Sequence, residues 1–100
     1  ASKHALLGLT RIAAMELAEH GITVNAVCPG TTRSAMNDKR LVYDAKRLGT
    51  SIEKLEEAAS PLGRRLEPEE VATMVACLAG DEARGINGQA INVCGGTVMY

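Results

Sequence analysis

Residues 21–30 read Gly-Ile-Thr-Val-Asn-Ala-Val-Cys-Pro-Gly, and this stretch decides the fold of the 100-residue chain. Residues 22–28 are short, rich in β-branched side chains and almost continuously apolar, which is typical of a buried strand in a parallel sheet. Gly21 predicts the end of a preceding helix, because glycine adopts the left-handed cap conformation freely. Pro29-Gly30 predicts an abrupt end of the strand. The stretch therefore favours an α/β fold.

Helical patterns precede and follow this strand in the sequence. Residues 1–20 carry apolar side chains at helical spacing on several faces, which is typical of a helix that is buried on more than one side. Residues 31–36 predict a polar loop. Residues 37–60 predict two short amphipathic helices, of which the first ends at Gly49 and the second begins with a capping box at Thr50.

A third helix and a second strand complete the pattern. Pro68 occupies a first helical position with acidic residues around it, and an apolar stripe follows as far as Gly80. Residues 89–93 predict a strand that Gly95-Gly96 ends. A strand, a helical crossover and a second strand predict parallel pairing with a right-handed connection. Because two parallel strands are too few for a complete core, we expect further strands of this sheet to lie outside residues 1–100.

The composition argues against several classes of function. With 11 basic and 12 acidic residues and no basic block, the chain lacks a surface suited to nucleic acid, and its two tyrosines are too few to stack on bases. No apolar run approaches the roughly 18 residues of a membrane span. Cys28, Cys77 and Cys94 are odd in number and far apart, which argues against a zinc site and a disulfide framework. We therefore expect reduced thiols, no metal site, no membrane contact and a cytoplasmic protein.

The candidate site follows the first strand. In an open α/β sheet, ligands bind just beyond the carboxyl ends of the strands. The strand that ends at Pro29-Gly30 delivers residues 31–34 to this position, and their hydroxyls and backbone N–H groups suit the phosphates and the amide of a dinucleotide. On these residues alone, a solvated polar loop is the better explanation.

Four motifs in order resemble the C-terminal part of the short-chain dehydrogenase/reductase family. They are ASKHALLGLTR at 1–11, GITVNAVCPG at 21–30, PLGR at 61–64 with PEEVA at 68–72, and GQAINV at 88–93 with Gly95-Gly96. The resemblance implies a Rossmann-type doubly wound parallel sheet, in which residues 1–100 form the C-terminal part of one NAD(P)-binding domain. It also implies an oxidoreductase that transfers a hydride between NAD or NADP and a small carbonyl or alcohol substrate.

The C-terminal residues resemble one group within this family. Asn-Val-Cys-Gly-Gly at residues 92–96, close to a C-terminal Tyr, is similar to ketoreductases of aromatic polyketide synthesis. Cys94 stands where many family members have Asp. A 3-oxoacyl or polyketide ketoreductase is therefore implied, while the substrate and the choice between NAD and NADP stay open.

The family pattern makes Lys3 the active-site lysine, which also binds the nicotinamide ribose. Its partner is a tyrosine four residues earlier, which would lie two positions before Ala1 and is not in this chain. One helical turn apart, the two side chains would share a face, and the ammonium would lower the tyrosine pKa. The family's catalytic serine and glycine-rich phosphate loop are expected further upstream.

The resemblance places other roles after the first strand. Residues 37–66 would form a variable substrate lid. The apolar edge of this lid either covers a substrate or packs on the sheet, and the sequence favours neither interpretation over the other. Thr32 would meet the nicotinamide carboxamide through its backbone, and Ser34 would lie near the pyrophosphate, while Arg33 between them would face solvent or the lid. The implied cofactor-binding residues are Lys3, Pro29, Gly30, Thr32 and Ser34, and the lid residues are Met36, Leu41 and Val42.

Two functions remain open from the sequence. In the first, the parent protein is the oxidoreductase, and residues 1–100 alone are inactive because they lack the tyrosine and the phosphate loop. In the second, the chain is a non-catalytic oligomerisation or interaction module derived from the same fold. The many-sided apolar first helix predicts association, as a homodimer or homotetramer, under either hypothesis.

Overall fold

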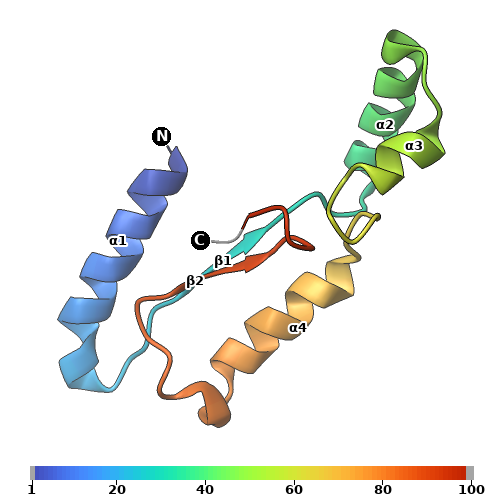
Figure 1. Cartoon of the computed structure of the whole chain (residues 1–100). Coiled ribbons are helices and arrows are strands. Elements are labelled where there is room, and N and C mark those ends of the chain that lie inside the picture. The colour runs from blue at the N-terminus through green and yellow to red at the C-terminus, as the bar shows by residue number, and fades with distance from the viewer. Residues whose placement is uncertain (1, 99–100) are drawn as a thin grey trace. The chain divides into compact units, whose positions relative to one another are not determined.

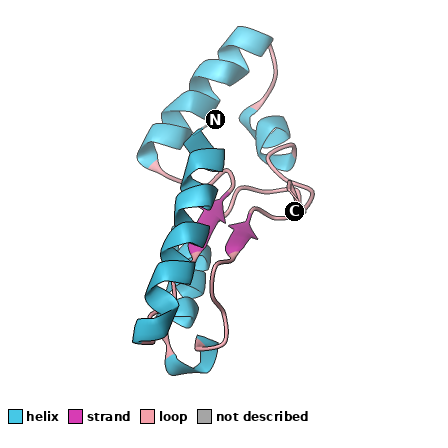
Figure 2. Ribbon diagram, turned by 90° about the vertical axis from the view of Figure 1, so that its left-hand side faces the viewer, coloured by secondary structure: helices cyan, strands magenta, loops and turns pink. Residues whose placement is uncertain are grey.

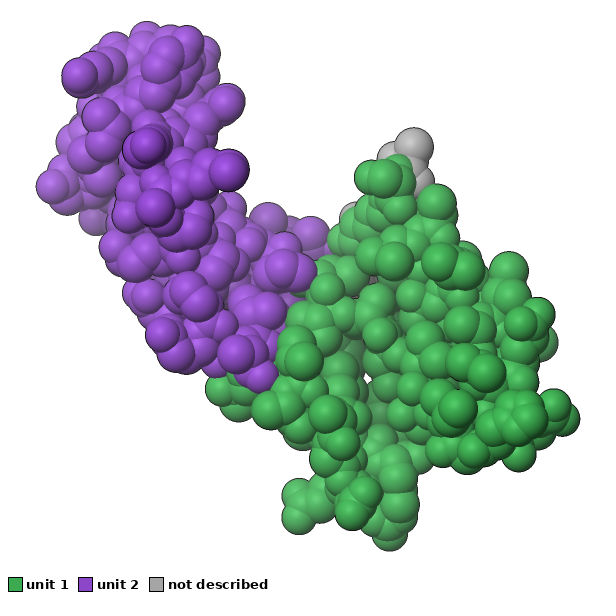
Figure 3. All heavy atoms as spheres, turned by 180° about the vertical axis from the view of Figure 1, so that it is seen from behind, with its two compact units in different colours: residues 1–28, 73–91 green, residues 29–72, 92–100 purple. Residues whose placement is uncertain are grey.

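The computed structural model describes residues 2–98, and Ala1 and residues 99–100 lie outside the described part. In chain order its elements are α1 (Ser2–Leu17), η1 (Ala18–His20), β1 (Ala26–Pro29), α2 (Ala35–Leu48), α3 (Ile52–Glu57), α4 (Pro68–Ala79), η2 (Asp81–Ala83) and β2 (Ala90–Val93) (Figure 1). The chain divides into two compact units (Figure 3). Unit 1 holds residues 1–28 and 73–91, and unit 2 holds residues 29–72 and 92–100.

The two strands pair side by side in one sheet (Figure 2). The Ala26 N–H donates to the Gln89 carbonyl at 2.9 Å, and the Gly30 N–H donates to the Val93 carbonyl at 2.8 Å. As the donor moves forward along the chain from Ala26 to Gly30, its acceptor also moves forward, from Gln89 to Val93. The pairing is therefore parallel, as the sequence predicts. Both strands therefore end at the same edge of the sheet.

The first strand begins at Ala26, later than the predicted residue 22, and ends at Pro29 rather than residue 28. Ahead of Ala26, side-chain amides make much of the connection. The Val24 N–H donates to Asn87 Oδ1 at 2.9 Å. Asn25 Nδ2 donates to the Ile86 carbonyl at 3.0 Å, and Asn25 Oδ1 accepts from the Gln89 N–H at 3.0 Å. The predicted start was wrong because side chains replace part of the backbone ladder there.

Unit 1 also contains α1, which ends in η1 and the left-handed Gly21 (φ 72°), as predicted. Two small residues, Thr10 and Ala14, are its buried positions. Asn87 Nδ2 donates to the Ala14 carbonyl at 3.4 Å, so one amide side chain joins α1 to the segment before β2. Four large apolar side chains of α1 stay exposed in the described chain: Leu6, Leu9, Ile12 and Met15.

In unit 2, α2 begins earlier than predicted and takes Ala35 and Met36 out of the expected polar loop. The cause is Ser34, which has extended backbone and accepts the Asn37 N–H on its Oγ at 3.0 Å. Gly49 ends α2 in the left-handed conformation (φ 66°), as predicted.

The start of α3 corrects a second expectation. The N-cap is Ser51, whose Oγ accepts the Lys54 N–H at 3.2 Å, so the predicted capping box at Thr50 is wrong by one residue. By contrast, α4 begins at Pro68 and ends just before Gly80, as its local signals predict.

Asn87 provides a test of the amide connection. Replacing it by Ala leaves the Val24 N–H without its acceptor and frees the Ala14 carbonyl, so we expect a loss of about 1–3 kcal/mol in the free energy of unfolding. Asn87→Asp keeps the acceptor oxygen and loses only the donor, so its loss should be smaller. Urea unfolding of the protein measures both variants. Equal losses would show that the Val24 bond is not the important one.

Candidate functional site

The segment after β1 begins with a close backbone contact. A Cβ built on Gly30 would lie 2.9 Å from the Cα and the Cβ of Cys94, a distance that real Cβ atoms do not tolerate. Glycine is therefore required where the end of β1 passes the residue that follows β2. Pro29, at the end of β1, is exposed.

Leu66 holds the next residues in an extended conformation. The Arg33 N–H donates to the Leu66 carbonyl at 2.7 Å, and the Leu66 N–H donates to the Thr31 carbonyl at 2.9 Å. In this parallel bridge, the backbone groups of Thr32 itself point away from Leu66. The Thr32 Oγ1 donates to the Gly30 carbonyl at 2.9 Å, whereas the Thr32 N–H has no hydrogen-bond partner within residues 2–98. That N–H is a donor for an external acceptor.

Ser34 adds a second donor and a hollow. Its Oγ accepts the Asn37 N–H, and the hydroxyl keeps its own hydrogen to donate. A pocket of about 320 Å³ is lined by Ser34, Met36, Asn37 and Arg40. The structure thus brings together two predicted residues, Ser34 and Met36, with two that sequence reasoning missed. On α2, Arg40 follows Met36 and Asn37 at the spacings of one helical turn, i,i+4 and i,i+3, which is the signal that would have identified Asn37 and Arg40.

The remaining lid residues lie elsewhere on α2. Leu41 is half-buried, Val42 is exposed, and neither lines the Ser34 pocket in the described structure. Lys3 lies in the first turn of α1, in unit 1, and is exposed. Its predicted role as the active-site lysine stays a prediction.

A buried arginine joins the lid helices. Arg65 is only 3% exposed, and its guanidinium donates to Glu56 Oε1 at 2.6 and 3.0 Å, to Asp38 Oδ1 at 2.7 Å and to Asn37 Oδ1 at 2.7 Å. Burial lowers the pKa of Arg65, but its hydrogen bonds with Asp38 and Glu56 outweigh burial and raise that pKa above its ordinary value. The guanidinium is therefore a fixed charge. The resemblance places residue 65 in the lid, residues 37–66, but the sequence predicts no role for its side chain.

Arg33 extends this cluster toward Thr32 and Ser34. Its Nε donates to Glu67 Oε1 at 2.9 Å, and its Nη2 lies 3.5 Å from Glu56 Oε2. Arg33 thus contacts the lid, which is one of the two positions expected for it. We call Arg33, Asp38, Glu56, Arg65 and Glu67 the arginine cluster.

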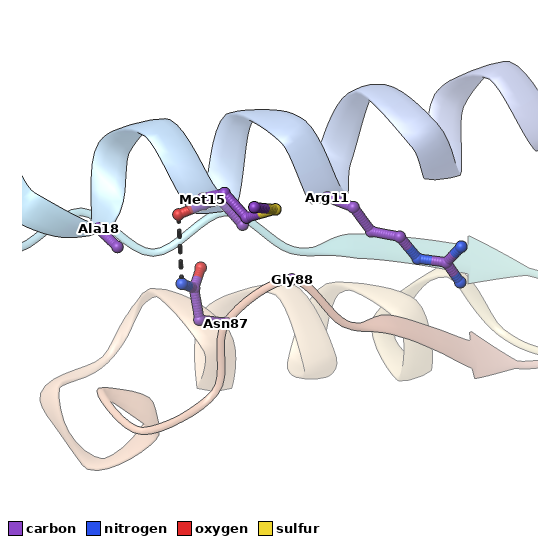
Figure 4. Close-up of a pocket in the computed structure, with 6 residues that line it drawn as sticks. Arg11, Met15, Ala18, Asn87 and Gly88 are labelled. Carbon is purple, nitrogen blue, oxygen red and sulfur yellow. Dashed lines mark hydrogen bonds between the residues drawn. The ribbon is translucent and has the colours of Figure 1, made fainter.

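Unit 1 has a hollow of its own. A groove of about 450 Å³ lies between α1 and the turn before β2, and Arg11, Met15, Ala18, Asn87 and Gly88 border it together with Ala14 (Figure 4). It contains none of the predicted site residues. Within residues 2–98, no group of His, Cys, Asp and Glu side chains has the arrangement of a metal site, and none of the three cysteines forms a disulfide there. No helix in this part of the chain is long and apolar enough to cross a membrane.

Comparison with known proteins identifies relatives over almost the whole chain. The profile of a family described as enoyl-(acyl carrier protein) reductase matches residues 1–98. The 3-oxoacyl-[acyl-carrier-protein] reductase FabG of Rickettsia felis is 44% identical over 99 residues, which cover 99% of this chain and 38% of the relative. The chain thus spans well under half the length of such curated relatives.

Solved structures give the same result. An actinorhodin polyketide ketoreductase variant, crystallised with NADPH, is 42% identical and superposes with a TM-score of 0.85 over 99% of this chain and 39% of its own. A short-chain dehydrogenase family protein from Francisella tularensis subsp. tularensis SCHU S4 is 34% identical, with a TM-score of 0.83 over 94% of this chain and 40% of its own. The similarity to a Rossmann-type fold confirms the fold class that the sequence predicts.

The start of α4 allows a test of the local electrostatics. The Arg64 guanidinium donates to both carboxylate oxygens of Glu70 at 2.6 and 3.0 Å, and the Glu67 N–H donates to the same carboxylate at 2.9 Å. These bonds, that of Arg64 first, lower the pKa of Glu70 from its usual 4.5 to about 2. Because the folded-state pKa is depressed, the stabilisation is present above pH 4.5 and is lost as the pH falls toward 2.

We expect an NMR titration of the Glu70 side-chain carboxyl to give a midpoint near pH 2, and Arg64→Met to move it back toward 4.5. The same midpoint in both proteins would mean that Arg64 does not hold this carboxylate in solution.

Proposed function

Because the chain belongs to the short-chain dehydrogenase/reductase family, we propose that it forms the C-terminal part of an NAD(P)-dependent oxidoreductase. The substrate is a small carbonyl or alcohol compound, and a 3-oxoacyl or polyketide ketone fits best. That choice is supported by relatives named as a 3-oxoacyl-[acyl-carrier-protein] reductase and a polyketide ketoreductase. The observation that carries the proposal is the pair of donors after β1, the Thr32 N–H and the Ser34 hydroxyl.

These donors fit a nicotinamide dinucleotide. Its carboxamide oxygen and its pyrophosphate oxygens are hydrogen-bond acceptors, and the segment offers a backbone N–H without a partner in residues 2–98 followed by a hydroxyl. The Thr32 N–H binds the carboxamide and Ser34 binds near the pyrophosphate, while Pro29 and Gly30 shape the chain ahead of them. When bound, the cofactor supplies or accepts the hydride, and the protein orients the reactants. Either NAD or NADP satisfies these groups.

Lys3 acts on the proton rather than on the hydride. Its ammonium favours the phenolate of a tyrosine one helical turn earlier, which lowers the pKa of that tyrosine toward the working range. The tyrosine then donates its proton to the carbonyl oxygen during reduction and accepts it back during oxidation. Lys3 also hydrogen-bonds the ribose hydroxyls of the cofactor.

The lid, residues 37–66, covers the substrate. Met36 is 83% exposed and lines the Ser34 pocket, so it offers an apolar side chain directly beside the cofactor segment. Leu41 and Val42 extend the apolar edge along α2. We further propose that the protein works in the cytoplasm as a homodimer or homotetramer, in line with the exposed apolar side chains of α1.

The role of Lys3 is testable in the complete protein, meaning the full translation product that contains residues 1–100. We expect Lys3→Met to lower kcat by roughly 10²–10⁴, because it removes the group that tunes proton transfer. Arg11→Met, a matched loss of an exposed cation on the same helix, should leave kcat unchanged. The readout is NAD(P)H absorbance with a 3-oxoacyl thioester or a cyclic ketone. Equal rates for the two variants would contradict the role of Lys3.

A second test separates the enzyme from a non-catalytic module. Residues 1–100 expressed alone should give no saturable enhancement of NAD(P)H fluorescence at low micromolar protein, because the proposed tyrosine and phosphate loop are not among them. The complete protein is the positive control. A discrete, folded oligomer of residues 1–100 in size-exclusion chromatography, together with an inactive complete protein, would support the module instead.

A further inference from the structure

We propose that Arg65 and Glu56 are positioning residues, which hold the lid helices on the cofactor segment and thereby set how tightly cofactor and substrate are held. This inference rests on the proposed function. It starts from the burial of Arg65, since a buried charge is unfavourable unless it is paired and hydrogen-bonded. All three guanidinium nitrogens donate to the partners described above. Arg64, its neighbour in sequence, is 47% exposed and pairs instead with Glu70 at the start of α4.

The partners of Arg65 come from both lid helices. Asn37 and Asp38 belong to the first turn of α2, and Glu56 belongs to the last turn of α3. Asn37 also lines the Ser34 pocket, and its N–H is the one that Ser34 caps. The Arg65 side chain therefore holds the beginning of α2 and the end of α3. Through Asn37 it also contacts the residue whose N–H is capped by Ser34, the proposed pyrophosphate contact.

Glu56 connects the same helices to the cofactor segment. Its Oε1 accepts from Arg65, and its Oε2 lies 3.5 Å from Arg33 Nη2. Arg33 stands between Thr32 and Ser34, the two proposed cofactor contacts. The carboxylate is only 24% exposed, so this ion pair is less screened by solvent than a surface pair.

The residue after Arg65 binds the cofactor segment through its backbone. Leu66 is 2% exposed, and its N–H and carbonyl bond to Thr31 and Arg33. One dipeptide therefore holds the cofactor segment through the backbone of Leu66 and the lid helices through the side chain of Arg65. None of these groups is proposed to touch the reacting atoms, so they act on binding rather than on proton or hydride transfer.

The experiment compares Arg65→Met and Glu56→Gln with the matched controls Arg64→Met and Glu57→Gln in the complete protein. For the first two we expect KM for the ketone and Kd for NAD(P)H to rise on the order of tenfold, with kcat within about threefold of wild type. The double variant should be little worse than either single variant, because both changes break one network. The control variants should have the KM, Kd and kcat of the wild type. Hydrogen exchange of residues 35–57 should increase in Arg65→Met, and NAD(P)H should protect these residues less.

Arg65→Lys keeps the charge without the planar fork and serves where Arg65→Met does not fold. If folded variants keep wild-type KM and Kd while the wild type is active, the positioning role is wrong and the proposed function stands. If every variant at residues 56 and 65 unfolds, these residues are only structural, and the inference also fails. A folded wild-type protein that neither binds NAD(P)H nor reduces a ketone overturns the proposed function and, with it, this inference.

Discussion

The parallel pairing of β1 with β2 is the contact on which the rest of the structure depends. Because the strands run in the same direction, their carboxyl ends meet at one edge, and the segment after β1 passes the residue after β2. This passage is so close that Gly30 cannot carry a side chain against Cys94. The pairing thus places Thr32 beyond the end of the sheet, where its N–H faces away from Leu66.

A second constraint, in unit 2, is the need to satisfy a buried guanidinium. Arg65 lies in the buried part of the segment between α3 and α4, and its guanidinium is satisfied by acceptors from both α2 and α3. Both helices are rich in charged side chains, and α3 has only 6 residues. The arginine cluster therefore joins the start of α2 to the end of α3 through charged hydrogen bonds.

The sequence predicts those elements whose signals are local. Pro68 and Gly80 mark the limits of α4 because proline favours a first helical turn and a glycine follows the last apolar residue of the stripe. Gly21 and Gly49 end their helices for the same kind of reason. The sequence does not predict the start of β1, because that start depends on Asn87, which is more than sixty residues away. It does not distinguish the two candidate caps of α3, because Thr50 and Ser51 carry equivalent hydroxyls in adjacent positions.

The candidate site divides in the same way. Motifs locate Thr32 and Ser34, since spacing from a strand end is readable in the sequence, but no spacing pairs Arg65 with Asp38. Cys94 illustrates how a departure from the family pattern is absorbed. Its Sγ accepts the Val98 N–H at 3.4 Å, and its carbonyl accepts from Thr97 Oγ1 at 2.9 Å. A thiol is a weaker acceptor than a carboxylate, yet it also brings a small apolar group to a site that is 7% exposed. The turn after β2 thus keeps its acceptor without burying a charge beside Gly30.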